Sequence, residues 1–279
     1  MSSAIVRFLP EALDFERGFE SLRRELLWED LGVDMTLALD AVTVTYGSTP
    51  ALSAASVSFP GGTSTALVGA NGSGKTTVLR LLSGLITPSQ GRVIGRTSST
   101  AFVRQSPRQH SWIPLRVSDV LVMGRYRDRG LLGRITGVDR ALVGEAAQRM
   151  DVAGLVNRQL DELSGGQRQR VLVAQALIQE ADVLLLDEPV TGLDLPSRDL
   201  ILQVIAEEAQ AGRSVVFSTH DLSEAAQADQ VVLLAGSVVA AGPPATILTP
   251  SMLSEVFGVL RVAPDQQSMI FDDHGHGHA

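Results

Sequence analysis

Residues 69–77 of the chain read GANGSGKTT, and this stretch decides the fold. It fits the pattern G-x-x-x-x-G-K-[ST], follows the apolar residues 66–68 and precedes residues 78–82, which favour a helix. A glycine-rich loop between a strand and a helix lets backbone N–H groups and the positive end of the helix dipole converge on a phosphate. The residues predicted to bind phosphate are Gly69, Asn71, Gly72, Ser73, Gly74, Lys75, Thr76 and Thr77.

Lys75 is the only lysine among the 23 lysine and arginine residues of the chain. Its ammonium is a compact point charge, whereas the planar fork of an arginine is too wide for such a loop. The single lysine of an arginine-using chain therefore supports a phosphate loop independently of the pattern. We place Lys75 among the catalytic residues as well as the binding residues.

Two adjacent acids, Asp187 and Glu188, follow the apolar residues 183–186. A phosphate loop also occurs in kinases, switch GTPases and motors, so a second site has to narrow the class. Acids at the carboxyl end of a buried strand face the phosphate loop of such a sheet. We predict that Asp187 and the Thr76 hydroxyl hold Mg²⁺ and that Glu188 polarises the attacking water.

The composition narrows the class of protein further. The 279 residues allow one large domain or two small ones, and the absence of cysteine excludes disulfides, thiolate zinc sites and cysteine nucleophiles. The net charge of −8 argues against a general affinity for nucleic acid. The longest near-apolar stretch, residues 231–242, is shorter than the roughly 18 to 20 residues of a membrane span, and the N-terminus resembles no secretory signal. We therefore expect a cytosolic protein that binds no nucleic acid.

The order of predicted elements is that of an α/β protein with an inserted helical section. Residues 1–34 carry no motif, and their apolar residues are spaced as in one amphipathic helix, so they are either an untranslated stretch before Met35 or a docking helix. No internal repeat is visible. Strands are expected at residues 35–46, 51–59, 64–68, near 101, at 183–187 and at 214–219, with a hairpin over 231–241; helices are expected from Lys75, across 117–160, near Gln167 and from Ser197.

Residues 163–167 read LSGGQ, and on this run the chain resembles the nucleotide-binding subunit of an ATP-binding cassette transporter. The family's other motifs stand in the same order, and the resemblance covers about residues 35–259. It implies a P-loop ATPase cassette with a RecA-like core, an antiparallel β subdomain and an inserted helical signature subdomain. It also implies hydrolysis of ATP with Mg²⁺, coupled to transport. Residues 260–279 would then form a C-terminal tail.

The signature residues Ser164, Gly165, Gly166 and Gln167 open a predicted helix, whose N–H groups and dipole would make a second anion site. The resemblance implies that two copies pair head to tail, so that each phosphate loop faces the partner's signature. It further assigns Gln105 to Mg²⁺ and the attacking water, His220 to the γ-phosphate as a catalytic residue, Asp194 to the dimer contact and Tyr46 to stacking on adenine. The chain departs from the family at Arg104, where proline is common.

Several shorter runs concern the transported substrate. Residues 112–115, 118–126, 242–244 and 257–259 resemble importers of zinc or manganese, and ferric-siderophore importers share part of these runs. Seven arginines in residues 101–134 form either a solvated face or a surface that docks on a membrane subunit and its phospholipids. The implied partners are a second copy, multi-span permease subunits and an extracytoplasmic metal-binding protein, with this chain peripheral on the inner face of the membrane. A soluble ABC ATPase without a transport role is the alternative from another class.

The chain ends in three alternating histidines after Asp272 and Asp273. Imidazoles combined with carboxylates suit Zn²⁺, Ni²⁺ or Cu²⁺ better than Mn²⁺, and the intervening glycines would let the tail wrap around an ion. The alternative is an inert tail, because six residues cannot close a site without outside ligands. The residues of this predicted weak Zn²⁺ site are His274, His276 and His278.

Overall fold

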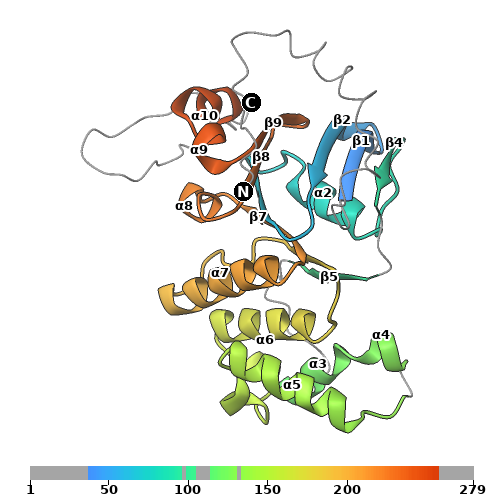
Figure 1. Ribbon diagram of the computed structural model, residues 1–279, viewed down its shortest axis with the longest axis vertical. Coiled ribbons are helices and arrows are strands. Elements are labelled where there is room, and N and C mark those ends of the chain that lie inside the picture. Colours follow the sequence, from blue (N-terminus) through green and yellow to red (C-terminus); the bar gives the residue numbers. More distant parts are fainter. Residues whose placement is uncertain (1–36, 96–98, 105–113, 131–132, 258–279) are drawn as a thin grey trace, which may run out of the picture. The chain divides into compact units, whose positions relative to one another are not determined.

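The computed structural model describes residues 37–95, 99–104, 114–130 and 133–257, all of which belong to one compact unit of the chain. In these ranges the strands form a three-stranded antiparallel sheet, of order β2-β1-β4, and a six-stranded sheet, of order β5-β6-β7-β3-β8-β9 (Figure 1). In the larger sheet β5, β6, β7, β3 and β8 run parallel to one another, and β9 is antiparallel to β8. The predicted α/β class with a separate antiparallel sheet is therefore confirmed. The strands are β1 (Leu37–Tyr46), β2 (Thr49–Phe59), β3 (Ser64–Val68), β4 (Gln90–Ile94), β5 (Thr100–Val103), β6 (Val183–Leu186), β7 (Ser214–Thr219), β8 (Gln230–Leu234) and β9 (Val238–Gly242).

The helices of the described residues fall into those beside the larger sheet and those of the inserted section (Figure 1). The insertion, expected as helix across residues 117–160, is confirmed, although it is broken into several short elements. In the described part of the chain no helix is both long and apolar enough to cross a membrane. The helices are α2 (Lys75–Leu82), α3 (Val117–Met123), α4 (Tyr126–Arg129), α5 (Gly137–Arg149), η2 (Ala153–Leu155), η3 (Leu160–Glu162), α6 (Gly165–Leu177), α7 (Leu195–Gln210), α8 (Leu222–Ala225), α9 (Pro244–Ile247) and α10 (Pro250–Phe257).

The larger sheet is buried on both faces, because each face has its own hydrophobic cluster. Leu184 and Leu186 of β6 pack into a cluster with α3, α5, α6 and α7. Val183 and Leu185 point the other way, into a cluster with α2 and the smaller sheet. Strands covered on both faces have near-continuous apolar sequences, as the VLLL run of β6 does.

The smaller sheet has the alternation of a half-buried sheet, interrupted once. Leu37 and Leu39 are buried, and so are Val42 and Val44, but the two pairs are out of phase. The shift occurs where Ala41 adopts φ 48° and the register with β2 slips, as in a β-bulge. Strand β4 was not expected from the sequence, because its QGRVI run carries few apolar residues and is mostly exposed.

The arginine-rich section after β5 differs from the expected face of arginines. Arg125 is buried, with 6% of its surface exposed, and Arg129 forms an ion pair with the fully buried Asp139. The Arg125 guanidinium therefore binds inside the helical section, whereas the Arg129 side chain is 36% exposed. The interpretation of all seven arginines as a docking or solvated face is wrong for Arg125.

Candidate nucleotide site

The predicted site residues gather at the carboxyl edge of the larger sheet because the strand register aligns the strand ends. Val68, the last residue of β3, pairs with Thr219, the last residue of β7, so Gly69 and His220 follow side by side. Leu186 of β6 pairs with Phe217, which places Asp187 beside Ser218. Ligands of open α/β sheets bind at this edge.

The phosphate loop is held in shape by its own glycines and by Lys75. Gly72 and Gly74 have φ values of 80° and 105°, a region that residues with a Cβ atom rarely adopt. A Cβ atom on Gly69 would lie 2.3 Å from the carbonyl oxygen of Leu234. The Lys75 ammonium donates to the carbonyl oxygens of Gly69, at 2.7 Å, and Ala70, at 3.0 Å. The lysine therefore turns back over the loop that precedes it.

Thr76, Asp187 and Ser218 form a chain of hydrogen bonds between the loop and two strands. The Thr76 hydroxyl donates to Asp187 Oδ2 at 3.0 Å, and the Ser218 hydroxyl donates to Oδ1 at 2.7 Å. Asp187 and Ser218 are both buried. Sequence reasoning found Thr76 and Asp187 but missed Ser218, whose signal is a polar residue directly after the apolar VVF run of the buried strand β7.

Glu188 follows Asp187 in a strained backbone conformation. Its φ is 48°, in the left-handed region, and its N–H donates to Ser218 Oγ at 2.8 Å. Non-glycine residues persist in this region only where the surroundings hold them, and they cluster at functional sites. Ser218 therefore positions both acids, one through its hydroxyl proton and the other through its oxygen.

The carboxylates at the carboxyl edge of the larger sheet influence the pKa of Lys75. Burial lowers the pKa of the Lys75 ammonium, and the carboxylates of Glu188 and then Asp187 oppose that shift. Burial is the larger effect, so the pKa of Lys75 is below its ordinary value. The two acids and the lysine are thus close enough to interact electrostatically across the edge of the sheet.

The predicted second anion site is the first turn of α6. Ser164 is the N-cap residue; its Oγ accepts from the N–H of Gln167 at 3.2 Å, and the Gln167 side chain accepts from the N–H of Ser164 at 3.1 Å. This reciprocal pair is a capping box, and the S-x-x-Q spacing in the sequence could have indicated it. Gly165 is exposed and Gly166 is buried.

Asp194 lies next to this turn within the same chain. It is the N-cap residue of α7, which begins at Leu195, two residues earlier than expected. Pro196 in the first turn was the missed signal, since proline is common there. A Cβ atom on Gly166 would lie 2.7 Å from Asp194 Oδ1 and 2.7 Å from Ser197 Oγ.

His220 is exposed directly after β7, in a turn fixed by its neighbours. Thr219 donates to the buried carboxylate of Glu224 and accepts from the N–H of Asp221. Arg198 of α7 forms ion pairs with Asp221 and Glu224. Helix α7 therefore braces the turn that carries His220.

The structure says less about the remaining two predicted site residues, Tyr46 and Gln105, than about those at the carboxyl edge of the larger sheet. Tyr46 ends β1 and is 46% exposed, as a side chain that stacks on a ligand has to be. Gln105 lies outside the described residues, one position after Arg104, which continues β5 at the same edge. Tail residues His274, His276 and His278 and residues 1–34 also lie outside them.

The residues at the edge suit Mg²⁺ bound together with phosphate. The described residues hold no group of three or more His, Cys, Asp or Glu side chains that could bind a metal alone. Magnesium bound with substrate phosphates takes only one or two protein oxygens, and Thr76 and Asp187 offer them. Ser73 Oγ is buried in the loop without a partner among the described residues, which suits a ligand that supplies one.

A family model for ABC transporters matches residues 52–191. The chain belongs to the ABC transporter family. It is 38% identical over 250 residues to a chelated iron transport system membrane protein of Yersinia pestis, covering 85% of this chain and 84% of that protein. It is 37% identical over 237 residues to a manganese transport system ATP-binding protein of Synechocystis, covering 81% and 91%. An ABC transporter solved in an inward-facing conformation matches with a TM-score of 0.73 and 29% identity, covering 84% of this chain and 94% of that one. The ATP-binding cassette fold and the ATPase class expected from LSGGQ are thereby confirmed.

Proposed function

We propose that the chain is the ATP-hydrolysing subunit that powers import of a divalent metal ion through separate membrane subunits. The observation that carries the proposal is the Thr76–Asp187 pair beside the phosphate loop, in a chain whose relatives are named as metal transport proteins. Zinc is the favoured substrate and manganese the next; a zinc transport ATP-binding protein of Treponema pallidum is 33% identical over 228 residues. Residues 35–259 form the ATPase domain, with residues 1–34 as an extension.

Each site residue has one task in this proposal. Lys75 and the loop N–H groups bind the β- and γ-phosphates, and Glu188 accepts a proton from the attacking water. Thr76, Asp187 and Gln105 hold Mg²⁺, which when bound neutralises developing charge on the phosphates. The remaining assignments follow the family resemblance: His220 contacts the γ-phosphate, Tyr46 stacks on adenine, and Asp194 contacts the partner copy.

A second copy of the chain completes the nucleotide site, because its Ser164–Gly166 turn faces the phosphate loop of the first copy. Mixing Lys75→Ala chains with Ser164→Arg chains tests this arrangement. A mixed head-to-tail dimer combines both defects in one site and leaves the other site intact, so the mixture should hydrolyse ATP where neither variant does alone. Mixing the Lys75→Ala/Ser164→Arg double variant with wild type is the control, because each site of that dimer carries one defect.

No recovery of ATP hydrolysis in the first mixture, with both variants folded, would contradict a site shared between chains.

The proposal places the chain on the inner face of the membrane, beside permease subunits that an extracytoplasmic metal-binding protein supplies.

Uptake in vesicles tests the substrate. Membrane subunits that co-purify with the tagged chain are reconstituted with it and the binding protein, and ATP-driven uptake of Zn²⁺, Mn²⁺ and a ferric chelate is compared. Zinc uptake that stops in Glu188→Gln is expected. The second candidate is a ferric chelate, which the Yersinia relative and a 38% identical hemin import ATP-binding protein of Streptomyces coelicolor favour.

The tail histidines would then bind Zn²⁺ weakly, as a sensor or buffer. A flexible glycine-spaced segment loses chain entropy when its ligands converge, which limits the affinity. Calorimetry compares the full chain with one ending at Asp273, at neutral pH in a magnesium background. Identical zinc uptake by both would show that the tail is inert.

A further inference from the structure

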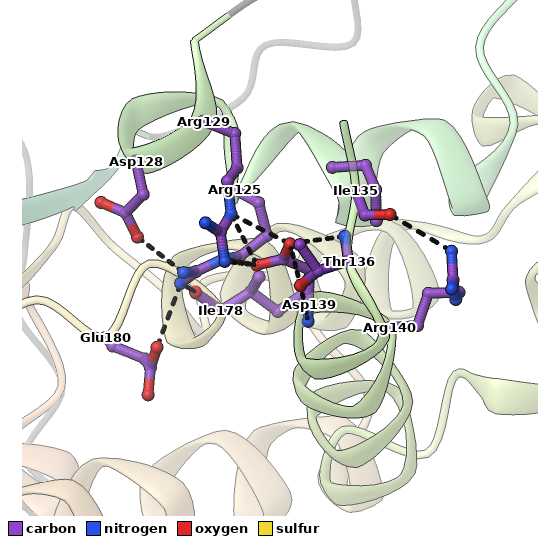
Figure 2. A network of polar contacts seen from close by, with 9 residues as sticks. All are labelled: Arg125, Asp128, Arg129, Ile135, Thr136, Asp139, Arg140, Ile178 and Glu180. Atoms are coloured by element: carbon purple, nitrogen blue, oxygen red, sulfur yellow. Dashed lines mark hydrogen bonds and ion pairs between the residues drawn. The ribbon is translucent and has the colours of Figure 1, made fainter. Parts of the chain in front are cut away.

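Arg125 joins three elements of the helical section through one guanidinium group (Figure 2). It is the N-cap residue of α4, and its side chain is 7% exposed. Its Nε donates to Asp139 Oδ1 in the first turn of α5 at 3.0 Å. One terminal nitrogen donates to the carbonyl oxygen of Ile178, the C-cap residue of α6, at 2.9 Å and to Glu180 in the following turn at 3.1 Å, and the other pairs with Asp128 at 2.8 Å.

Asp139 is the common acceptor of this network. Its carboxylate accepts from the Thr136 amide at 2.8 Å and hydroxyl at 2.7 Å, and from both Arg125 and Arg129. The Thr136 bonds, followed by those from Arg129 and Arg125, hold the pKa of Asp139 below its usual range. Figure 2 shows both guanidinium groups converging on Asp139, while only Arg125 continues towards Ile178 and Glu180.

Gly124 brings Arg125 this close to α6. A Cβ atom on Gly124 would lie 2.7 Å from the Gln175 carbonyl oxygen and 3.0 Å from Ile178 Cβ. The φ of Gly124 is −57°, which any residue adopts, so the glycine is needed for the approach of two backbones and not for its own conformation. Gly124 and Arg125 therefore act together on the last turn of α6.

A network of this kind is weak support for stability, because buried ion pairs are often replaced by apolar residues without loss. What an arginine fork adds is orientation, since its donors are fixed in one plane. Helix α6 has 13 residues and begins at the signature. It is about 20 Å long, so a tilt of about 10° at its C-terminal end would displace its first turn by about 3 Å. Displacements of about 1 Å can cost about 10²-fold in rate.

We propose that Gly124 and Arg125 form a clamp that positions the signature turn of α6 for the partner copy's nucleotide. Arg125 is a positioning residue here, acting through α6 on Ser164–Gly166. The inference rests on the proposed head-to-tail site. It goes beyond that function in naming what sets the angle of the signature helix.

Arg125→Ala and Arg129→Ala in the full-length chain test the clamp. Both remove one guanidinium from Asp139, but only Arg125 reaches α6, so Arg129→Ala is the matched control. We expect Arg125→Ala to lower kcat by about tenfold or more while the KM for ATP and the ATP affinity of the single chain change by less than about twofold. Arg129→Ala should keep kcat within about twofold, with a smaller loss of thermal stability because its side chain is 36% exposed.

Gly124→Ala is the second variant, in case Arg125→Ala folds poorly. It keeps every charge and an allowed backbone conformation but pushes on the Gln175 carbonyl, and it should lower kcat in the same selective way. Glu180→Gln, which keeps an oxygen acceptor for Arg125, should restore most of the rate lost in Glu180→Ala. Equal effects of Arg125→Ala and Arg129→Ala on kcat, or a normal kcat in both Arg125→Ala and Gly124→Ala, would overturn the clamp.

Ser164→Arg separates the two proposals. If Ser164→Arg hydrolyses ATP normally, the shared site itself is refuted. If Ser164→Arg is inactive and Arg125→Ala is normal, only the clamp is refuted.

Discussion

Gly166 in the first turn of α6 lies against Asp194 at the start of α7, so close that a Cβ atom on the glycine would be 2.7 Å from the Asp194 carboxylate. The signature turn and the residue expected at the dimer contact are therefore packed together in one chain. In a head-to-tail dimer both would be presented to the partner as one surface. Any change that separates them should act on assembly before it acts on nucleotide binding.

Gly166→Ala is expected to destabilise the fold by about 1–3 kcal/mol, the usual cost of overpacking, and to lower ATP hydrolysis. Binding of ATP to the single chain should stay normal, because the phosphate loop lies before and at the start of α2 and not in α6. Thermal unfolding and nucleotide titration measure the two effects. Gly165→Ala is the structural control: among the described residues nothing lies within 4 Å of its Cβ position, so its thermal stability should not fall. Similar losses of stability in both variants would contradict the close packing of Gly166.

Lys75→Arg should weaken ATP binding although the charge is kept. The Lys75 ammonium is buried and donates to Gly69 and Ala70, and a planar fork cannot make these bonds in the same space. Hydrogen bonds to charged groups contribute about 1.5–3 kcal/mol, so affinity should fall by about tenfold or more. Titration with a fluorescent nucleotide checks this, with Arg80→Lys in the last turn of α2 as the reciprocal control. Unchanged ATP affinity in Lys75→Arg would show that the site does not require a lysine, and the single lysine would no longer support the phosphate loop.

Glu188→Gln should bind MgATP and lose hydrolysis. The carboxamide keeps the shape and the N–H bond to Ser218, but it cannot take a proton from water. Loss of a general base typically costs about 10² to 10⁴ in rate. The variant should also accumulate as an ATP-bound dimer in size-exclusion chromatography, whereas Glu145→Gln on the exposed face of α5 should not. Turnover near that of wild type would exclude Glu188 from the catalytic role.

The main strands and the convergence of the site were predictable because they follow from sequence pattern and from the geometry of parallel strands. Apolar runs ending in GANGSGKTT and in Asp187-Glu188 mark parallel strands, and parallel strands align their carboxyl ends. The register that sets Thr219 beside Val68 confirmed the expectation. Strand β4 was not predicted, because an edge strand can pair with its neighbour although its sequence holds few apolar residues.

Burial of charge was not predictable in this way. Arg125 and Arg127 stand in the same run, yet one is buried in an ion network and the other is exposed. The difference depends on Gly124 and on the end of α6, some 50 residues further along the chain, as the 53-residue separation of Arg125 and Ile178 shows. Ser218 was missed for a related reason: its role depends on strand register and not on a local motif.

The buried acid Glu224 gives the chain a pH dependence of known sign. Burial raises the pKa of Glu224 above its ordinary value; the Thr219 hydrogen bond, Arg198 and His220 oppose this, and Asp221 adds to it. The folded state therefore binds this proton more tightly than the unfolded chain does. Its contribution to stability is fully present below the unfolded pKa, near 4.5, and is lost as pH rises through the folded pKa.

Glu224→Gln removes this titration and keeps an oxygen that can accept from Thr219. The melting temperature of the variant, relative to wild type, should therefore rise between pH 4.5 and neutral pH. Glu207→Gln is the control with the opposite sign, because hydrogen bonds from Gln203 and Arg149 lower the pKa of Glu207. The Glu207 contribution is fully present above the unfolded pKa, near 4.5, and is lost as pH falls through the folded pKa, so this variant should differ from wild type by a constant amount above pH 4.5 and by less in more acidic solution. Melting curves of the three proteins from below pH 4.5 to neutral pH measure both trends. If the difference between Glu224→Gln and wild type is flat with pH, the carboxyl of Glu224 titrates as it does in the unfolded chain, and the bracing of the His220 turn does not depend on its burial.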